Sequence, residues 1–208
     1  MAKKLRIGIR PSPLASKQFE EVVGYLKDRY SGRIFEIKKI FTPGDRDKIT
    51  PISQVEGSDF FTADIDQQLL EGEIDLAVHS SKDLPEKINS GLELVFESDP
   101  LSPFDALVSR QKLKFFDLPA GWRIGTSSQR RKEQVKALRP DLTLVDIRGN
   151  IEERLDLIRQ GKIDALIVAE AALLRLGLEK HISQVLPQDI FPAHPKQGQI
   201  SILARKSG

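Results

Sequence analysis

The sequence predicts an α/β protein with two domains, and three observations support this prediction. Short apolar runs of strand length alternate with segments in which apolar residues recur at helical spacing. Segments rich in proline interrupt both patterns twice, at residues 98–103 and 191–195. The 208 residues suffice for one large domain or for two modest ones, and the two interruptions favour two.

The first domain is expected to begin with a strand at 5–9 that runs into a helix at 13–29. Ser12 is a favoured N-cap residue, and Pro13 suits the first position of a helix. The patterns that follow predict, in order, a strand at 34–41, a turn at 42–45, a mobile loop at 46–59, a helix at 60–71, and strands at 74–78 and 92–97.

The second domain repeats the alternation of strands and helices. Its expected elements are strands at 106–109, 123–125, 142–146 and 164–169 and helices ending at 138 and spanning 151–160 and 171–176. We expect a last strand at 200–203 to complete the sheet of the first domain. The predicted limits are 1–98 with 196–208 for the first domain, 103–191 for the second, and hinges at about 99–102 and 192–195.

Composition excludes several classes of protein. A net charge of +2 is too small to indicate nucleic-acid binding, and aromatic residues, at 6%, are too few for a base-stacking platform. The apolar runs are too short to cross a membrane, and no apolar targeting segment follows the first lysines, so we expect a cytoplasmic protein. The absence of cysteine excludes disulfides, thiolate metal sites and thioether attachment of a cofactor. The three histidines lie far apart, so nothing supports a metal site.

Five polar residues, 79–83 (His-Ser-Ser-Lys-Asp), directly follow the expected strand at 74–78. The carboxyl end of a strand is where open α/β sheets bind ligands. Polar groups that leave a buried strand together are costly unless they serve one another or a ligand. We therefore expect this cluster to face a cleft, although a polar loop that caps the next element would explain any single member.

Arginines recur at the ends of the predicted strands. Arg10 stands where the first strand ends and a helix begins, which is a ready site for an anion. Residues 126–128 (Thr-Ser-Ser) open the helix that carries Arg130 and Arg131, and their N–H and hydroxyl groups suit an anion as well. Three further arginines lie at or just beyond later strand ends: Arg148, Arg154 and Arg175. Because arginine binds carboxylates bidentately, this recurrence predicts a carboxylate site; the alternative is that they are surface arginines that neutralise neighbouring acids.

Five motifs occur in order along the chain: Arg10-Pro11-Ser12-Pro13-Leu14-Ala15, Gly44-Asp45, Asp75-Leu76-Ala77-Val78-His79-Ser80-Ser81-Lys82-Asp83-Leu84-Pro85, Gly125-Thr126-Ser127-Ser128 with Arg130-Arg131, and Asp146-Ile147-Arg148-Gly149-Asn150. Together they resemble the porphobilinogen deaminase (hydroxymethylbilane synthase) family over nearly the whole chain. The resemblance implies two domains like those of type II periplasmic binding proteins, with mixed five-stranded sheets flanked by helices, two hinge crossings and an active site between the domains. It also implies a transferase of tetrapyrrole (heme) biosynthesis that adds porphobilinogen units head to tail to a dipyrromethane primer and releases ammonia.

The resemblance also assigns roles to individual residues. It implies that Asp83 is the catalytic aspartate, whose carboxylate stabilises positive charge on the pyrrole nitrogens. It implies that six arginines hold the acetate and propionate groups of the substrate: Arg10, Arg130, Arg131, Arg148, Arg154 and Arg175. Hydroxyl and lysine side chains within the matching motifs are expected to line the same substrate site: Ser12, Ser81, Lys82, Thr126, Ser127 and Ser128.

Some features depart from the family pattern. The family has a third domain whose cysteine holds the primer through a thioether, and we do not expect that domain here because the chain stops after the strand that closes the first domain. The family usually has lysines where this chain has Ser58 and Ala63, and small residues where it has Lys196 and Gln199. All four positions are expected to lie near the primer.

Two hypotheses follow from this pattern. The first is a porphobilinogen deaminase-like transferase whose primer is not held by cysteine, and the sequence leaves open whether a partner chain supplies the third domain. The second is a non-catalytic homologue that binds a pyrrole polycarboxylate or another small anion in the interdomain cleft. Retention of Asp83 favours the first, because a binder of carboxylates gains little from a negative charge in its site. The absence of cysteine and the expected absence of the third domain favour the second. Neither hypothesis involves nucleic acid or a membrane.

Overall fold

A computed structural model describes residues 3–47, 50 and 58–206 of the chain. Most of the loop expected at 46–59 lies outside these residues. The described chain forms two compact units: the first contains residues 3–47, 58–100 and 199–206, and the second contains residues 50 and 101–198. The domain limits and hinges expected from the sequence stay predictions.

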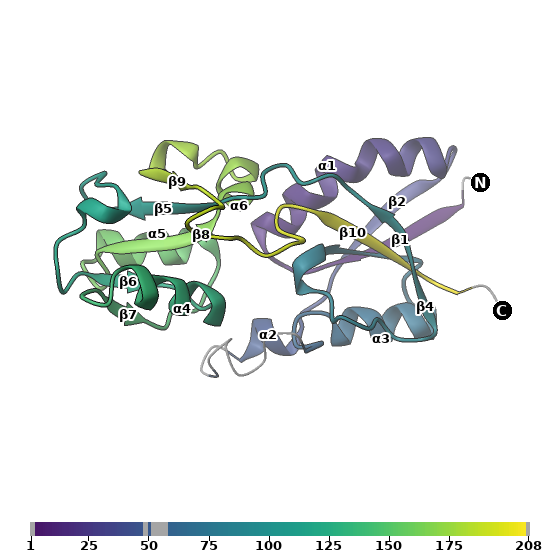
Figure 1. The fold of residues 1–208 in the computed structure, drawn as a ribbon. Helices are drawn as coiled ribbons and strands as arrows, with labels where there is room; N and C mark the ends of the chain where they lie inside the picture. Colours follow the sequence, from purple (N-terminus) through teal and green to yellow (C-terminus); the bar gives the residue numbers. More distant parts are fainter. Residues whose placement is uncertain (1–2, 48–49, 51–57, 207–208) are drawn as a thin grey trace. The chain divides into compact units, whose positions relative to one another are not determined.

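The first unit is built on a five-stranded mixed sheet (Figure 1). Its strands, in spatial order, are β2 (Ile34–Lys39), β1 (Lys4–Ile9), β3 (Leu76–Ser80), β10 (Ile200–Arg205) and β4 (Leu92–Glu97). The first three strands are parallel, and β10 runs antiparallel to both of its neighbours. The last strand of the chain therefore lies in the first sheet, as the sequence predicts.

Helices cover both faces of this sheet, as Figure 1 shows. Helix α1 (Pro13–Arg29) follows β1, and its side chains Val22 and Leu26 are buried in a cluster with residues of β1, β3 and β10. Helix α3 (Ala63–Glu71) buries Ile65 and Leu69 in a separate cluster with Ala77 of β3. The two crossovers run in opposite directions along the sheet, and right-handed connections then place their helices on opposite faces.

Three local predictions in the first unit were wrong. The strand expected at 74–78 is β3 (Leu76–Ser80), so His79 and Ser80 belong to the strand instead of following it. The turn expected at 42–45 is a short helix, α2 (Pro43–Arg46), in which Thr42 and Asp45 form a reciprocal capping box. Helix α3 begins three residues later than the expected residue 60, because the N–H groups of Thr62 and Ala63 bond to the carbonyl of Asp59 in a preceding turn. Prolines and aspartates signal turns and helix starts alike, so composition alone did not separate the two.

The second unit has a sheet of the same kind. Its strands, in spatial order, are β7 (Thr143–Val145), β6 (Arg123–Gly125), β8 (Ala165–Ala169), β5 (Asp105–Ser109) and β9 (Gln184–Leu186). The strands β7, β6 and β8 are parallel, and β5 is antiparallel to β8. The sequence did not predict β9, which is three residues long and has a single buried residue, Leu186.

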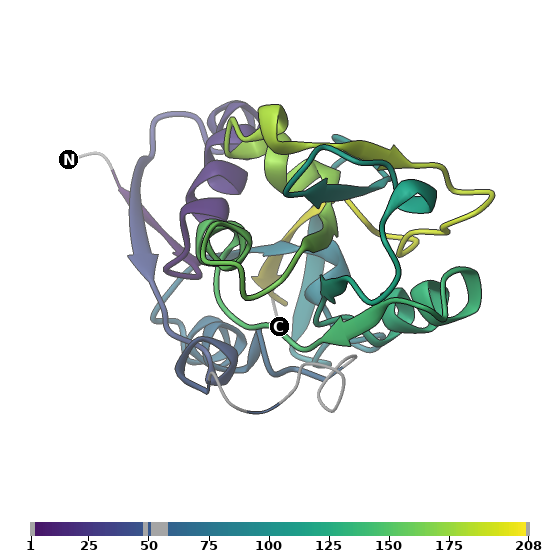
Figure 2. The same ribbon diagram turned by 90° about the vertical axis from the view of Figure 1, so that its left-hand side faces the viewer.

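Helices α4 (Gln129–Leu138) and α5 (Ile151–Arg159) lie on opposite sides of this sheet, as Figure 2 shows. Val135 of α4 is buried with Phe115 and Phe191 in the core on one side. Helix α6 (Glu170–Arg175) continues directly from β8. None of the helices in the described residues is both long enough and apolar enough to cross a membrane.

In each unit the carboxyl ends of the three parallel strands lie at one end of the sheet, and the loops and helices that follow these strands carry the residues that the sequence analysis singled out. The opposite ends share a different feature. In the first unit the N–H and guanidinium of Arg6 donate to the carboxylate of Asp75, and in the second those of Arg123 donate to Asp164. The ligand-binding candidates and these buttressing ion pairs thus occupy opposite ends of each sheet.

Candidate functional site

Asp83 lies just beyond the carboxyl end of β3, in a single 3-10 turn, η2 (Ser81–Asp83). Its side chain is 28% exposed, and Nη1 of Arg10 lies 4.0 Å from its Oδ2 atom. Within the described part of the chain, Arg10 is the one basic side chain within 4.0 Å of this carboxylate. The distance is too long for a hydrogen bond, so both oxygens of Asp83 remain able to accept donors.

Arg10 follows β1 and is bound mainly by Asp45. Its Nη2 atom lies 2.5 Å from Oδ1 of Asp45, and its Nε atom lies 3.2 and 3.3 Å from the two carboxylate oxygens. The ring of Phe61 stacks on the guanidinium, with 4.6 Å between its centroid and Cζ of Arg10. The structure thus brings Arg10 and Asp83 together, but in a cluster of one cation and two anions rather than in an open anion site.

The polar cluster at 79–83 divides into two parts. His79 is buried with its Nε2 atom 3.4 Å from Asp66 of α3, Ser80 accepts a hydrogen bond of 2.7 Å from Gln18 of α1, and the buried hydroxyl of Ser81 lies 2.7 Å from that of Ser201. These three side chains serve the protein interior. Lys82 and Asp83 are half-buried, so only the last two residues of the cluster remain candidates for contact with a ligand.

Ser12 has a structural role that its position in the sequence also predicted. Its hydroxyl accepts a hydrogen bond of 3.1 Å from the N–H of Ala15 and so caps α1. An N-cap of this kind typically stabilises a helix by about 1 kcal/mol. Ser12 and Ser81 are thus held by their own protein, and their assignment to a substrate site stays a prediction.

In the second unit, residues 126–128 (Thr-Ser-Ser) connect β6 to α4. Thr126 and Ser127 are buried, and the hydroxyl of Ser127 donates to the carbonyl of Ile147 in the loop after β7. Ser128 is the N-cap residue of α4 and is half-buried. The loops after β6 and β7 are therefore tied together at one edge of the sheet, next to the N-terminus of a helix whose partial positive charge favours anions.

Arg131 and Asp105 form a buried ion pair in this edge. Nε and Nη2 of Arg131 donate to the two oxygens of Asp105 at 3.0 and 2.5 Å, Nη1 donates to the carbonyl of Ile167, and Nη2 also reaches Oε1 of Gln197. Four of the five N–H donors of Arg131 are thereby used within the protein. Arg130 is more open, with its side chain 28% exposed and Nη2 3.6 Å from Asp105.

The other three arginines are also half-buried. Arg148 follows β7. The Nε atom of Arg154, on α5, donates to the carbonyl of Gly149 at 2.8 Å. The Nη2 atom of Arg175, at the end of α6, donates to the carbonyl of Gly198 at 2.7 Å. The second unit thus gathers its five predicted arginines at the carboxyl ends of its parallel strands, while Arg10 belongs to the first unit.

Sequence reasoning missed three residues that organise these clusters: Asp45, Asp105 and Gln197. Asp45 occurs in a motif of the resembled family, but no role was assigned to it. Asp105 is fully buried, and Gln197 donates to its Oδ1 atom at 2.6 Å. A carboxylate at the start of an apolar strand, in Phe104-Asp105-Ala106-Leu107, was the available signal, because a buried charge requires a partner.

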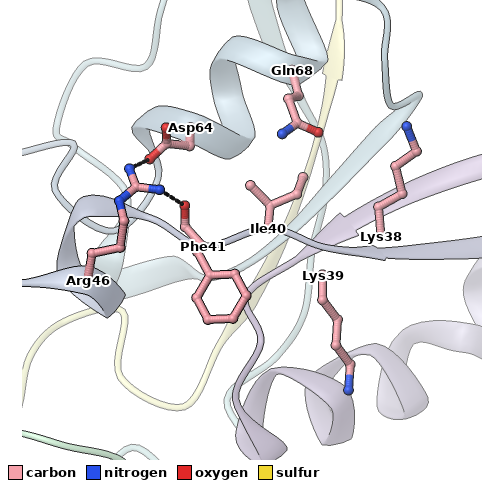
Figure 3. A pocket seen from close by; sticks show the side chains of 7 residues that line it. All are labelled: Lys38, Lys39, Ile40, Phe41, Arg46, Asp64 and Gln68. Atoms are coloured by element: carbon pink, nitrogen blue, oxygen red, sulfur yellow. Dashed lines mark hydrogen bonds and ion pairs between the residues drawn. The ribbon is translucent and has the colours of Figure 1, made fainter.

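The first unit also has an open pocket of about 510 Å³ at the end of β2 (Figure 3). It contains none of the predicted site residues. Arg46 within it is held by Asp64 and by the carbonyl of Phe41, each at 2.8 Å. Lys38 and Lys39 point away from one another (Figure 3), so their charges do not converge on one ligand. No cluster of three or more metal-binding side chains occurs among the residues that the structure describes.

Comparison with solved structures identifies the fold. The regulatory domain of OxyR2 from Vibrio vulnificus in its reduced form superposes with a TM-score of 0.57 at 16% identity, over 100% of this chain and 89% of the other. A putative lipoprotein from Actinomyces odontolyticus gives a TM-score of 0.53 at 14% identity, over 100% and 85%. The chain has the two-domain α/β fold of type II periplasmic binding proteins, with mixed sheets and flanking helices.

Comparison with curated sequences identifies the family. The porphobilinogen deaminases of Geobacter metallireducens and Geotalea daltonii are 44% and 42% identical over 203 residues, which is 98% of this chain. The chain spans 64% of the length of these two relatives. The sequence model described as porphobilinogen deaminase, dipyromethane cofactor binding domain, matches residues 5–208. With this match and these identities, the chain belongs to the porphobilinogen deaminase family.

Proposed function

We propose that this chain acts in tetrapyrrole biosynthesis by condensing porphobilinogen units into a linear hydroxymethylbilane with release of ammonia. Membership of the family supports the substrate and the reaction. The observation that carries the proposal is the position of the Asp83 carboxylate and its lack of a direct hydrogen bond with Arg10. Its carboxylate stands at the end of a buried strand, partly exposed, while the neighbouring Arg10 is bonded to Asp45 instead.

Asp83 would act by electrostatic stabilisation. Loss of ammonia from porphobilinogen leaves a pyrrole that carries positive charge, and formation of the new carbon–carbon bond places positive charge on a second pyrrole ring. That ring becomes neutral again when the carbon that formed the bond loses its proton to solvent. A fixed carboxylate that accepts hydrogen bonds from the pyrrole N–H groups becomes a stronger partner as that charge develops, so it lowers the barrier. Asp83 suits this role because its oxygens can accept two donors without first breaking a direct ion pair.

The arginines at the edge of the second sheet would hold the acetate and propionate groups. Arg130, Arg148 and Arg154 are half-buried, which leaves them accessible while keeping their charges poorly screened. Arg131 has four donors bound within the protein, so we assign it to the support of Arg130 rather than to direct contact. Arg175 would orient the segment that contains Gly198.

A dipyrromethane primer fits this site in its charge. Each of its rings carries carboxylate groups, and the same arginines would bind them by charge-assisted hydrogen bonds. The primer supplies the free pyrrole position to which the next unit is added. Because the 208 residues contain no cysteine, none of them can hold it through a thioether, and binding by these residues would be non-covalent.

The test is to incubate the full chain with porphobilinogen, with and without a linear pyrrole primer, and to measure porphobilinogen consumption and ammonia release. We expect consumption by the wild type and a loss of at least about a hundredfold for Asp83→Asn, the scale for removal of one electrostatic stabiliser. Asp28→Asn, an exposed aspartate on α1, serves as the control and should retain full activity.

A binding assay separates this proposal from a non-catalytic homologue. In an enzyme, Asp83→Asn should still bind porphobilinogen, because the lost charge matters mainly in the transition state. If the wild type never consumes porphobilinogen in the presence of primer, yet binds it, the proposal fails and the chain is a binding protein. Such a protein should bind equally well or better after Asp83→Asn, since an anion repels carboxylate ligands.

A further inference from the structure

Arg10 has two carboxylates in its vicinity, and it is bonded to only one of them. Its Nη2 and Nε atoms contact Asp45 at 2.5 to 3.3 Å, whereas its Nη1 atom stops 4.0 Å from Asp83. Asp83 is the more exposed of the two, at 28% against 12% for Asp45. Arg10 therefore forms hydrogen bonds with Asp45 and none with Asp83. We attribute this preference to the orientation of Asp45.

Asp45 is fixed by donors of its own. The N–H and the hydroxyl of Thr42 donate to its Oδ2 atom at 3.0 and 2.8 Å, and Thr42 is fully buried. Burial alone would raise the pKa of Asp45, but the hydrogen bonds and charge of Arg10, together with the donors of Thr42, hold that pKa below its usual range. Asp45 therefore stays charged at neutral pH and stays aimed at Arg10.

The other face of Arg10 is also restrained. Phe61 stacks on the guanidinium at 4.6 Å, and a cation over an aromatic face gains further electrostatic attraction. Phe61 in turn packs on Gly44, where a Cβ atom would lie only 2.3 Å from the ring. The residue before Asp45 must therefore be small for Phe61 and Asp45 to reach Arg10 together.

We infer that Asp45 is a positioning residue for Asp83 and acts through Arg10. By holding the guanidinium, it keeps Arg10 from closing the last 4.0 Å onto Asp83. Both oxygens of Asp83 then stay open to N–H donors of a ligand, while Arg10 stays 4.0 Å away without a direct hydrogen bond. The expected importance of Asp45 for catalysis rests on the proposed function of Asp83. Its role in keeping Arg10 from pairing with Asp83 does not depend on that function.

Loss of the charge of Asp45 should redirect Arg10. A half-buried guanidinium that loses its bidentate partner is left poorly compensated, and the nearest remaining carboxylate is Asp83. A direct pair would occupy the oxygens that the ligand needs. It would also make Asp83 harder to protonate, because an adjacent opposite charge favours the ionised form.

The experiment follows the side-chain carboxyl of Asp83 by NMR in protein labelled with carbon-13 aspartate, assigned from the Asp83→Asn variant. In Asp45→Asn we expect the titration midpoint of Asp83 to move to lower pH by about one unit, the lower end of the range for a carboxylate that gains an arginine neighbour. The control is Asp64→Asn, which removes the partner of Arg46 in the same unit and should leave the Asp83 titration in place. The rate of porphobilinogen consumption should fall at least about tenfold in Asp45→Asn only.

Two further variants decide the cause. Adding Arg10→Gln to Asp45→Asn removes the redirected cation, so the midpoint should return to the wild-type value or above it. If Asp45→Asn does not fold, Thr42→Val, which removes one donor to Asp45, should give a smaller shift in the same direction. An Asp83 titration that does not move in any of these variants overturns the inference. If the wild type consumes no porphobilinogen, the proposed function fails, but the titration still tests the positioning role.

Discussion

Arg131 donates to both carboxylate oxygens of Asp105, with Nε 3.0 Å from Oδ2 and Nη2 2.5 Å from Oδ1. The two side chains are 8% and 0% exposed, so the pair is shielded from water. Gln197 donates to the same carboxylate from a segment 92 residues further along the chain. This network joins α4, β5 and the segment that precedes β10, all at the edge of the second sheet that carries the other arginines.

We predict that Arg131→Ala will destabilise the protein rather than simply weaken its ligand binding. The substitution leaves the carboxylate of Asp105 buried and poorly compensated, which should cost about 3–5 kcal/mol in the free energy of unfolding. Urea denaturation without ligand measures this cost. Arg130→Ala is the matched control, because Arg130 is more exposed and lies 3.6 Å from Asp105; it should cost far less. If the unfolding midpoint of Arg131→Ala is unchanged, Arg131 does not stabilise the fold, and direct contact with the ligand becomes the better explanation of its position.

Arg148→Ala should instead weaken the binding of carboxylate ligands. Arg148 lies in the loop after β7 and is half-buried, and the loss of a hydrogen bond to a charged group typically costs about 1.5–3 kcal/mol. Titration calorimetry with porphobilinogen, or with a small tricarboxylate, measures the change. Arg159→Ala is the control, since Arg159 is 66% exposed and pairs with Asp156 of its own helix. If the two variants bind the ligand with equal affinity, Arg148 does not contribute to binding and is a surface charge like Arg159.

The sequence predicted the architecture well because the relevant signals are local. Three signals depend on neighbours within a few positions: apolar runs of strand length, the Ser12-Pro13 helix start, and the switch from apolar to polar residues at His79, within β3. The return of the last strand to the first sheet was also correct. Because parallel strands end at one edge, placing arginines at strand ends was enough to gather the five arginines of the second unit.

The partners of these residues could not be predicted, because they are distant in sequence. Arg10 is bonded to Asp45, 35 positions away, and Arg131 to Asp105, 26 positions away. Periodicity shows which side chain leaves a strand, but it does not show whether that side chain meets a ligand or another part of the protein. For this reason Ser81 and Arg131 looked like ligand-binding residues in the sequence, although the structure shows their polar atoms engaged within the protein.

Gly198→Ala should destabilise the second unit through a steric clash with the backbone. Gly198 has a φ angle of +84°, and a Cβ atom there would lie 2.2 Å from the carbonyl oxygen of Ser102. Gly177→Ala is the matched control, because its φ angle is +66° and nothing lies within 4 Å of the added atom. The control should lose about 1–2 kcal/mol for the left-handed conformation alone. Gly198→Ala should lose more, measured by urea denaturation; equal losses would show that the segment moves freely away from Ser102.

The last prediction concerns acid stability and the ion pair between Arg123 and Asp164. Hydrogen bonds from the guanidinium of Arg123 hold the pKa of Asp164 below its ordinary value of 3.8, in spite of partial burial. Near and below pH 3.8 the unfolded chain therefore binds more protons than the folded chain at this site. The contribution to stability is fully present above that pH and is lost as the pH falls through the lower value of the folded state. Asp164→Asn should accordingly lower the free energy of unfolding at pH 7 and flatten its decline in acid, because the variant has no charge to lose. Urea denaturation from pH 7 down to pH 3 checks this, with Asp156→Asn as control because the side chain of Asp156 is 47% exposed. A decline in acid as steep as that of the wild type would mean that Asp164 does not contribute to it.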